Sequence, residues 1–195
     1  MISDDDLIQS IKEGRDQHFE TLINRYKKPI LNFIFKMIYD YDEAQNLSQE
    51  VFITLFKSLG RYRIQGNFQA YIFTIAKNLT LNYIKKSKRI VNLSSLLNKN
   101  AADRYFHHHE SPDNQLEQEV KEQQLVSALK ALKENQRIAL ILKVYLDFSY
   151  KKIAEITDWS IPKIETLISR AKAQLKNKIF LQEKPIQNVK NVREK

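Results

Sequence analysis

Glycine and proline are scarce in this chain, and their scarcity constrains the fold more than any other feature of the sequence. Only three Gly and four Pro occur among 195 residues. The hairpins of an all-β fold consume these residues, because Gly supplies positive φ angles and Pro presets the turn. We therefore expect an all-α fold. At this length the chain can form two small helical domains.

Apolar residues recur at helical spacing through the first half of the sequence. The pattern predicts four helices, over residues 4–12, 19–39, 43–59 and 68–86. Asp42 is the expected N-cap of the third helix, whose apolar stripe Phe56 helps to widen. Gly60 and Gly66 bracket the loop that precedes the fourth. Together these helices predict an N-terminal domain over residues 1–89.

The helical pattern fails after this domain, where Ser, Asn, His and Pro mix without a period. We expect a flexible linker over residues 90–116. The adjacent His107, His108 and His109 within it are not spaced to close a metal site, so no metal is expected. Helical spacing returns over 116–132 and 135–145. A C-terminal domain over 117–182 and a basic tail over 183–195 complete the prediction.

Two short helices joined by a tight turn are predicted near the end of the C-terminal domain. Ser149 is the expected N-cap of the first helix, and residues 157–160 form the break. Pro162 suits the first turn of the second helix, which runs into a stretch rich in Lys and Arg. The small Ala154 lets the two helices approach closely. This arrangement predicts a helix-turn-helix.

Charge is distributed unevenly along the chain, in a way that suggests two surfaces for a polyanion. Residues 1–60 hold ten acidic and seven basic side chains, whereas residues 61–90 hold seven basic and no acidic ones. Aromatic rings interleaved with cations suit unpaired bases, and Asn can hydrogen-bond base edges. The side chains of this segment that we expect to bind DNA are Tyr62, Arg63, Phe68, Tyr71, Lys77, Asn78, Asn82, Lys85, Lys86 and Arg89.

Several functional classes find little support in the sequence. The chain has no Cys, no phosphate-cradling Gly loop, and no His outside His18 and the linker, so neither catalysis nor a cofactor is expected. The acidic N-terminus is not a signal peptide, and no apolar run is long enough to span a bilayer, which predicts a cytoplasmic protein. A two-domain regulator whose helix-turn-helix binds duplex operator DNA remains an alternative.

Long stretches of the chain resemble one known family. FETLINRYKKPILNFIF, DYDEAQNLSQEVFITLFKSLGRYR and GNFQAYIFTIAKNLTLNYIKKSKR resemble the second conserved region of extracytoplasmic-function (ECF) sigma factors of the sigma-70 family. LVSALKALKENQRIALILKVYLDFSYKKIAEITDWSIPKIETLISRAKAQLKNKI is similar to their fourth region. The resemblance covers roughly residues 17–89 and 124–179. It implies a factor that binds core RNA polymerase, recognises the minus-35 and minus-10 promoter elements and promotes DNA melting.

The resemblance also implies roles for individual residues and partners. Asn46, Gln49 and Glu50 lie where the family contacts the clamp of the polymerase β′ subunit, and the loop from Ile64 to Ala70 lies where it holds the melted minus-10 strand. The expected minus-35 contacts are Ser160, Pro162, Lys163, Thr166, Ser169 and Arg170. Further implied partners are the β flap and an anti-sigma protein. The chain departs from the usual family residues at Asn46, Asn82, Asp158 and Leu167.

Overall fold

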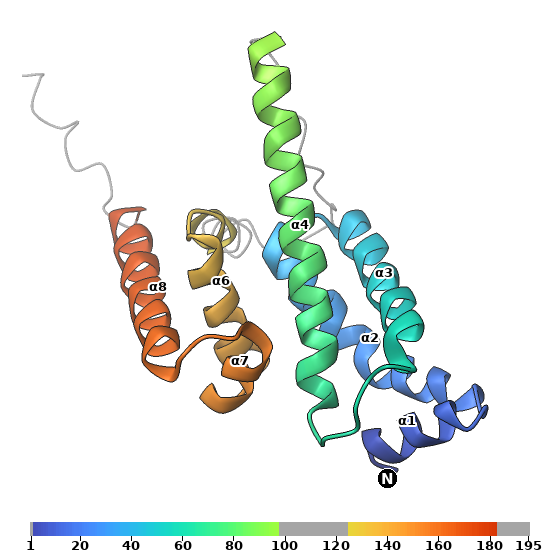
Figure 1. Cartoon of the computed structure of the whole chain (residues 1–195). Coiled ribbons are helices and arrows are strands. Elements are labelled where there is room, and N and C mark those ends of the chain that lie inside the picture. Colours follow the sequence, from blue (N-terminus) through green and yellow to red (C-terminus); the bar gives the residue numbers. More distant parts are fainter. Residues whose placement is uncertain (1, 98–124, 183–195) are drawn as a thin grey trace, which may run out of the picture.

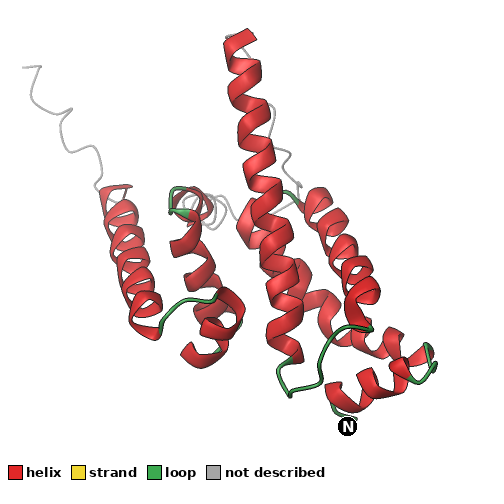
Figure 2. Cartoon of the chain, in the orientation of Figure 1, coloured by secondary structure: helices red, strands yellow, loops and turns green. Residues whose placement is uncertain are grey.

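The computed structural model describes residues 2–97 and 125–182, which we call the first half and the second half. Every regular element in these ranges is a helix, and no strand occurs among them (Figure 2). The all-α fold expected from the scarcity of Gly and Pro is confirmed. Helices α6, α7 and α8 lie on one side of the long helix α4, α1 and α3 lie on the other, and α2 passes behind α4 (Figure 1).

Four helices build the first half: α1 (Asp4–Lys12), α2 (Gln17–Ile38), α3 (Tyr41–Leu59) and α4 (Phe68–Leu97). Ser3 caps α1 by accepting the backbone N–H of Asp6, and Asp40 caps α3 by accepting that of Glu43. A side-chain oxygen at this position satisfies a backbone donor that the helix itself leaves unpaired. The apolar faces of the four helices meet in one buried cluster around Phe33, Leu55 and Ile72.

The second half contains a helical stretch over 125–130, then α6 (Glu134–Leu140), a π-helical turn η1 (Ile141–Tyr145), α7 (Tyr150–Thr157) and α8 (Ile161–Gln182). Ser149 caps α7 by accepting the N–H of Lys152. Asp158 ends α7 in the left-handed conformation at φ 58°, and Pro162 lies in the first turn of α8. Asp tolerates this conformation better than most residues, so the turn forms without the Gly that is usual there. The predicted helix-turn-helix is confirmed.

The structure moves three of the predicted boundaries. The cap of α3 is Asp40, two residues before the predicted Asp42. Helix α4 continues to Leu97 and so occupies the first eight residues of the predicted linker, because no Gly or Pro interrupts residues 90–97. The helix predicted over 135–145 changes to a π-helical turn at Ile141. The rest of the predicted linker, with its three histidines, and the basic tail from residue 183 lie outside the described residues.

The two halves are in direct contact. Ile138, Ile141 and Leu142 of the second half belong to the same buried cluster as the core of the first half. The rings of Phe73 in α4 and Phe148 before α7 meet edge to face with centroids 5.0 Å apart. The spacing of apolar residues predicted two helical domains but contains no sign of this contact.

Candidate nucleic-acid and polymerase interfaces

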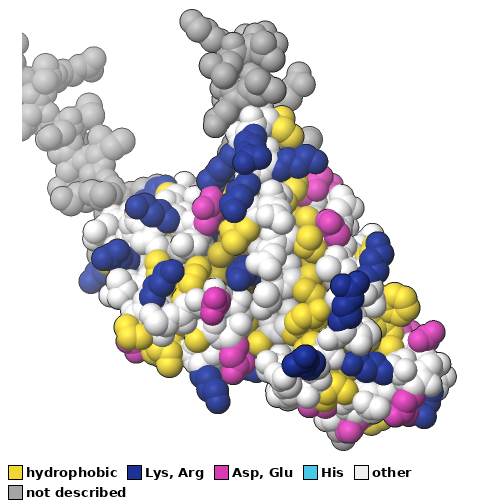
Figure 3. Space-filling view, viewed as in Figure 1, with side chains coloured by type: hydrophobic (Ala, Val, Ile, Leu, Met, Phe, Trp, Pro, Cys, Tyr) yellow, Lys and Arg dark blue, Asp and Glu magenta, His cyan; other side chains and the backbone are white. Residues whose placement is uncertain are grey.

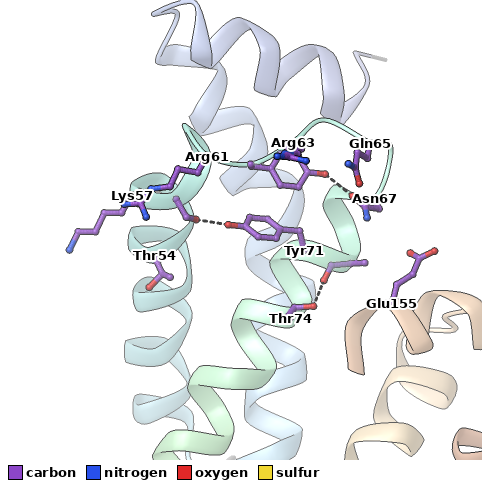
Figure 4. Close-up of a pocket in the computed structure, with 12 residues that line it drawn as sticks. Thr54, Lys57, Arg61, Arg63, Gln65, Asn67, Tyr71, Thr74 and Glu155 are labelled. Carbon is purple, nitrogen blue, oxygen red and sulfur yellow. Dashed lines mark hydrogen bonds between the residues drawn. The ribbon is translucent and has the colours of Figure 1, made fainter. Parts of the chain in front are cut away.

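A cavity of about 690 Å³ opens between the C-terminal end of α3, the loop over 60–67 and the first turns of α4 (Figure 4). Its lining combines three cationic side chains with two tyrosines and several amides and hydroxyls. The lining residues are Thr54, Lys57, Ser58, Arg61, Tyr62, Arg63, Gln65, Asn67, Ala70, Tyr71, Thr74 and Glu155. Only Glu155 comes from the second half. A cavity with aromatic walls and a cationic rim suits an unstacked base and its phosphate.

Two hydrogen bonds fix the tyrosine wall of this cavity. The hydroxyl of Tyr62 donates to Oδ1 of Asn67 at 3.0 Å, and that of Tyr71 donates to Oγ of Ser58 at 2.8 Å. The two rings lie 4.7 Å apart between centroids and are inclined at 36°. Burial raises the pKa of Tyr62 to about 12, and the nearby carboxylate of Asp5 adds to the rise. The Tyr62 hydroxyl is therefore neutral at physiological pH, and the two hydrogen bonds hold both rings of the wall in place.

The polar face of α4 continues from the cavity towards the C-terminal end of the helix. Asn78 and Asn82 are exposed and one helical turn apart, and the cations Lys85, Lys86 and Arg89 follow them, also exposed. Figure 3 shows Lys and Arg side chains gathered over this end of α4. Residues four apart share one helix face, so the amides and the first cations lie in a line along the helix. Such a line can follow a nucleic-acid strand.

Not all of the aromatic residues predicted to bind DNA have a ring that DNA can reach. Phe68 is only 2% exposed, and it packs edge to face against Tyr26 and Tyr62. We correct its predicted role, because a ring covered on both sides by core residues cannot stack on a base. Tyr62 is also buried, at 7% exposed, and contributes to the cavity wall. Tyr71 is half-buried and lines the cavity, and Arg63 is exposed at its rim.

Lys77 lies on α4 but faces the second half. Its ammonium donates to the backbone carbonyl of Ile156 in α7 at 2.9 Å. Burial lowers the pKa of Lys77, and the nearby carboxylate of Asp158 opposes that effect. In this arrangement Lys77 is engaged within the chain rather than free for a phosphate.

The expected polymerase-binding residues lie together on the surface of α3. Asn46, Gln49 and Glu50 are all exposed. Ile53 and Phe56 continue the same face and are 54% and 52% exposed, which is high for large apolar side chains. Phe56 was predicted to widen the buried stripe of α3. Instead it leans on the edge of Phe19 in α2, with centroids 5.1 Å apart, and remains half exposed.

The exposed face of α8, together with Ser160 directly before it, carries every residue predicted to contact the minus-35 element. All six are exposed: Ser160, Pro162, Lys163, Thr166, Ser169 and Arg170. The opposite face buries Ile164, Ile168 and Ala171. Lys163 lies over the ring of Trp159, with its ammonium 5.0 Å from the ring centroid. Trp159 was not among the predicted residues, although an aromatic residue in the turn beside a Lys was a visible signal.

Some of the residues that line the cavity were not predicted from the sequence. Lys57 and Arg61 line it but were not predicted to bind DNA, and Asn67 was predicted only as part of the loop from Ile64 to Ala70. The two cations flank Gly60, where the chain leaves α3, so a charge count around that turn was the available signal. Within residues 2–97 and 125–182, no group of His, Cys, Asp or Glu side chains could hold a metal ion. In the same ranges no helix is long and apolar enough to cross a membrane.

Comparisons with known proteins agree with this division of the chain. The family model described as Sigma-70 region 2 matches residues 22–90, and that described as Sigma-70, region 4 matches residues 122–175. The RNA polymerase sigma factor YlaC of Bacillus subtilis is 27% identical over 157 residues, which cover 80% of this chain and 89% of that protein. The ECF RNA polymerase sigma-E factor of Escherichia coli K12 is 24% identical over 91% of this chain and 95% of its own length.

Two solved structures share the fold. The sigma factor RpoE of Bartonella quintana, in complex with the anti-sigma factor NepR, matches 84% of this chain and 97% of its own with a TM-score of 0.64 at 23% identity. CnrH, in complex with the cytosolic domain of CnrY, matches 91% of this chain and 97% of its own with a TM-score of 0.68 at 17% identity.

Proposed function

We propose which surface of this chain binds which partner during promoter recognition. The chain belongs to the sigma-70 family of RNA polymerase sigma factors, as a member of the ECF type. It binds core RNA polymerase, recognises promoter DNA and promotes transcription initiation. The polymerase makes and breaks the bonds, and we propose no catalytic role for this chain. Because both partners reside in the cytoplasm of bacteria, we also propose that location.

We assign the polymerase contact to the exposed face of α3. Asn46, Gln49 and Glu50 provide polar groups, and the adjoining Ile53 provides an apolar centre. Interfaces typically combine a buried apolar centre with a polar rim. By resemblance to the family, the partner surface is the clamp of the β′ subunit. The replacement of the usual Asp by Asn46 removes one charge from this contact.

We assign capture of the melted minus-10 strand to the cavity and the adjoining face of α4. The observation that carries this assignment is the continuity between the tyrosine-walled cavity and the exposed Asn78 and Asn82. An extruded base can enter the cavity while the amides hydrogen-bond the next base edges. Stacking contributes about 1–3 kcal/mol per base, which offsets the cost of unstacking. The exposed Lys85, Lys86 and Arg89 then neutralise phosphates.

We assign the minus-35 duplex to α8. Its exposed Lys163, Thr166 and Arg170 lie on successive turns, as side chains that read a major groove do. The described residues 2–97 and 125–182 then form the two functional domains. A regulator that binds only duplex operator DNA would use α8 in the same way, but it would leave the cavity and the amides of α4 without a role.

An anti-sigma protein is a further proposed partner. The two solved structures described above hold RpoE with an anti-sigma factor and CnrH with the cytosolic domain of CnrY. The shared fold supports the proposal that this chain is held in a similar way.

Reconstituted transcription with bacterial core polymerase on a library of random promoter fragments tests the proposed function. We expect the chain to select fragments that share two elements, one near minus-35 and one near minus-10. Binding to the library without polymerase, followed by no transcription from the bound fragments, would instead support the duplex-only regulator.

A further inference from the structure

Helix α1 lies beside the loop that joins α3 to α4 (Figure 1). The match to Sigma-70 region 2 begins at residue 22, so this helix precedes it. Two side chains of α1 reach the loop, and they share one face of the helix because they are seven residues apart. The ammonium of Lys12 donates to the backbone carbonyl of Tyr62, and a Cβ atom placed on Gly66 would lie 3.9 Å from Oδ2 of Asp5. The helix therefore contacts the loop near both of its ends.

Helix α1 is itself held against the rest of the first half. Its apolar face buries Leu7 and Ile8 completely in the core. At its N-terminal end, Asp4 accepts a hydrogen bond from the hydroxyl of Tyr26 and forms an ion pair with Arg25, and both partners lie in α2. Segments with many buried apolar contacts open less readily than exposed ones. The helix can therefore serve as a fixed support for the loop beside it.

The loop needs such a support because residues 61–67 form neither helix nor strand. A segment without regular structure depends on its neighbours for a single conformation. Tyr62 is held at two points. Its hydroxyl donates to Asn67 and its ring packs against that of Tyr71, while Lys12 holds its backbone carbonyl. The side chain is thus fixed from within the cavity wall, and the backbone is fixed from α1.

The position of Tyr62 determines the shape of the cavity to which we assign an extruded base. Tyr62 forms part of the wall, and its neighbours Arg61 and Arg63 line the same cavity. A shift of the Tyr62 backbone moves all three side chains, because consecutive residues are joined through rigid peptide planes. Ordering a ring only when the base arrives lowers the affinity. Lys12 is not among the residues that line the cavity, so it acts on the cavity only through the loop.

We propose that Lys12 is a positioning residue for capture of the melted minus-10 strand: through the carbonyl of Tyr62 it holds the loop over 60–67 in the conformation that receives a base. This inference rests on the proposed function of the cavity. Without the hydrogen bond, the loop spends a smaller fraction of its time in that conformation, and the apparent affinity for the strand falls with that fraction. Lys12 itself touches neither base nor phosphate.

Three variants of the full-length chain separate this role from others. Lys12→Met removes the ammonium but keeps a long side chain of high helix propensity, so α1 should still form. Lys12→Arg keeps a cationic donor of similar length. Lys28→Met is the control, because it removes an exposed Lys from α2. The midpoint of thermal unfolding checks that each variant is folded.

The first measurement is the affinity of each variant, bound to core polymerase, for a fluorescent fork-junction DNA. The probe carries the single-stranded minus-10 element of a promoter that the parent chain transcribes, and a second set of probes carries one abasic site at each minus-10 position. We expect Lys12→Met to bind the intact probe about fivefold more weakly than the parent, and Lys12→Arg and Lys28→Met to bind it as the parent does. On the probe whose abasic site weakens the parent most, Lys12→Met and the parent should bind equally, because the base that uses the cavity is gone.

The second measurement examines the loop without DNA. Hydrogen exchange of the free chain, followed by mass spectrometry, should be several-fold faster in Lys12→Met at the amides of residues 60–67. Exchange within α3 should stay unchanged, because the hydrogen bonds of that helix do not involve Lys12.

A folded Lys12→Met variant that binds the intact probe as tightly as the parent would overturn the proposal, and so would unchanged exchange in the loop. A loss of equal size on the intact and the abasic probes would also overturn it, because that pattern indicates a phosphate contact or general damage. Failure of the proposed function gives a different result. In that case no abasic site in the minus-10 element weakens binding by the parent, whichever residue occupies position 12.

Discussion

The ammonium of Lys77 caps the C-terminal end of α7 by donating to the carbonyl oxygen of Ile156, 79 residues further along the chain. The capped helix is the first helix of the helix-turn-helix, and the capping residue lies on the helix that we assign to the melted strand. One hydrogen bond thus links the two DNA-binding parts of the protein. Promoter binding and the relative position of the halves are therefore expected to depend on each other.

The polar face of α3 gives a prediction for polymerase binding. Replacing Gln49 and Glu50 with Ala should weaken capture by core polymerase about tenfold or more, equivalent to about 1.4 kcal/mol. Both side chains are exposed, so the free energy of unfolding should change by less than about 0.5 kcal/mol. The matched control is Gln9→Ala/Glu13→Ala, an exposed pair of the same residue types on α1 and at its C-cap. Equal capture by both double variants would contradict the assignment of α3.

Ile53 gives a second prediction on the same face. Its side chain is 54% exposed in the free chain and should become the apolar centre of the polymerase contact. Ile53→Ser should lower affinity for core polymerase by roughly tenfold, because a centre residue commonly contributes more than 1 kcal/mol. Ile2→Ser is the control, since Ile2 is 55% exposed and lies at the N-terminus. Surface plasmon resonance with immobilised polymerase measures both, and similar losses for the two variants would rule out a specific role for Ile53.

The raised pKa of Tyr62 predicts a loss of stability at alkaline pH. Its pKa is about 12 in the folded chain and about 10 in the unfolded one, mainly because burial penalises the phenolate. Below pH 10 the tyrosine is protonated in both states and adds no pH dependence. Between pH 10 and about 12 the unfolded chain releases this proton first, so the free energy of unfolding falls as the pH rises.

Denaturant unfolding at several pH values tests this prediction. The Tyr62→Phe variant cannot ionise at this position, so its stability should decrease less steeply than that of the parent between pH 10 and 12. Burial also raises the pKa values of Tyr26 and Tyr39, so a residual slope is expected from them. Identical slopes for parent and variant would mean that Tyr62 is not buried in solution.

The helices could be predicted from the sequence wherever local chemistry specifies them. Ser149 and Pro162 are strong signals for the starts of α7 and α8, and both helices begin where these residues require. The polar residues predicted for binding on α3 and α8 are likewise exposed in the structure, while their roles stay predictions. These features depend on contacts between near neighbours, which spacing alone can reveal.

Features that depend on distant packing could not be predicted in this way. Phe68 and Phe56 both lie on helices with strong apolar stripes, yet Phe68 is buried and Phe56 is half exposed. The exposure of each ring depends on its contact with α2, where Tyr26 packs against Phe68 and Phe19 packs against Phe56. The spacing of apolar residues within α3 and α4 contains no information on these contacts. The capping of α7 by Lys77 is similar, because the acceptor is a backbone carbonyl in the other half of the chain.

The cations in the C-terminal part of α4 should strengthen DNA binding equally at every base sequence. Replacing Lys85, Lys86 and Arg89 with Ala should weaken promoter binding by the polymerase complex at every sequence tested. The slope of log affinity against log salt should become shallower by about one unit for each phosphate that is no longer neutralised. The control is Lys27→Ala/Lys28→Ala, two exposed cations on α2. An effect confined to particular minus-10 sequences would show that these side chains read bases.

Asn78 and Asn82 should act in the opposite way, by reading bases rather than phosphates. They are exposed, one turn apart and next to the tyrosine-walled cavity, and an Asn side chain can both donate to and accept from a base edge. Replacing both with Ala should reduce promoter opening and weaken the preference for particular bases at the minus-10 element. Removing a paired hydrogen bond between an Asn and a base costs about 1–3 kcal/mol of discrimination.

Two measurements separate this effect from a general weakening of binding. Permanganate reactivity of thymines in the opened region reports melting, and a footprint over the minus-35 duplex reports the binding of α8, which should persist in the double Asn variant. Arg170→Ala should show the reverse order, with recruitment impaired before melting, because Arg170 lies on the exposed face of α8. The control Asn24→Ala/Asn32→Ala removes two exposed amides from α2. If the Asn78→Ala/Asn82→Ala variant opens every promoter as well as the parent and with the same sequence preference, these two amides do not read the melted strand, and the assignment of base reading to this face of α4 is wrong.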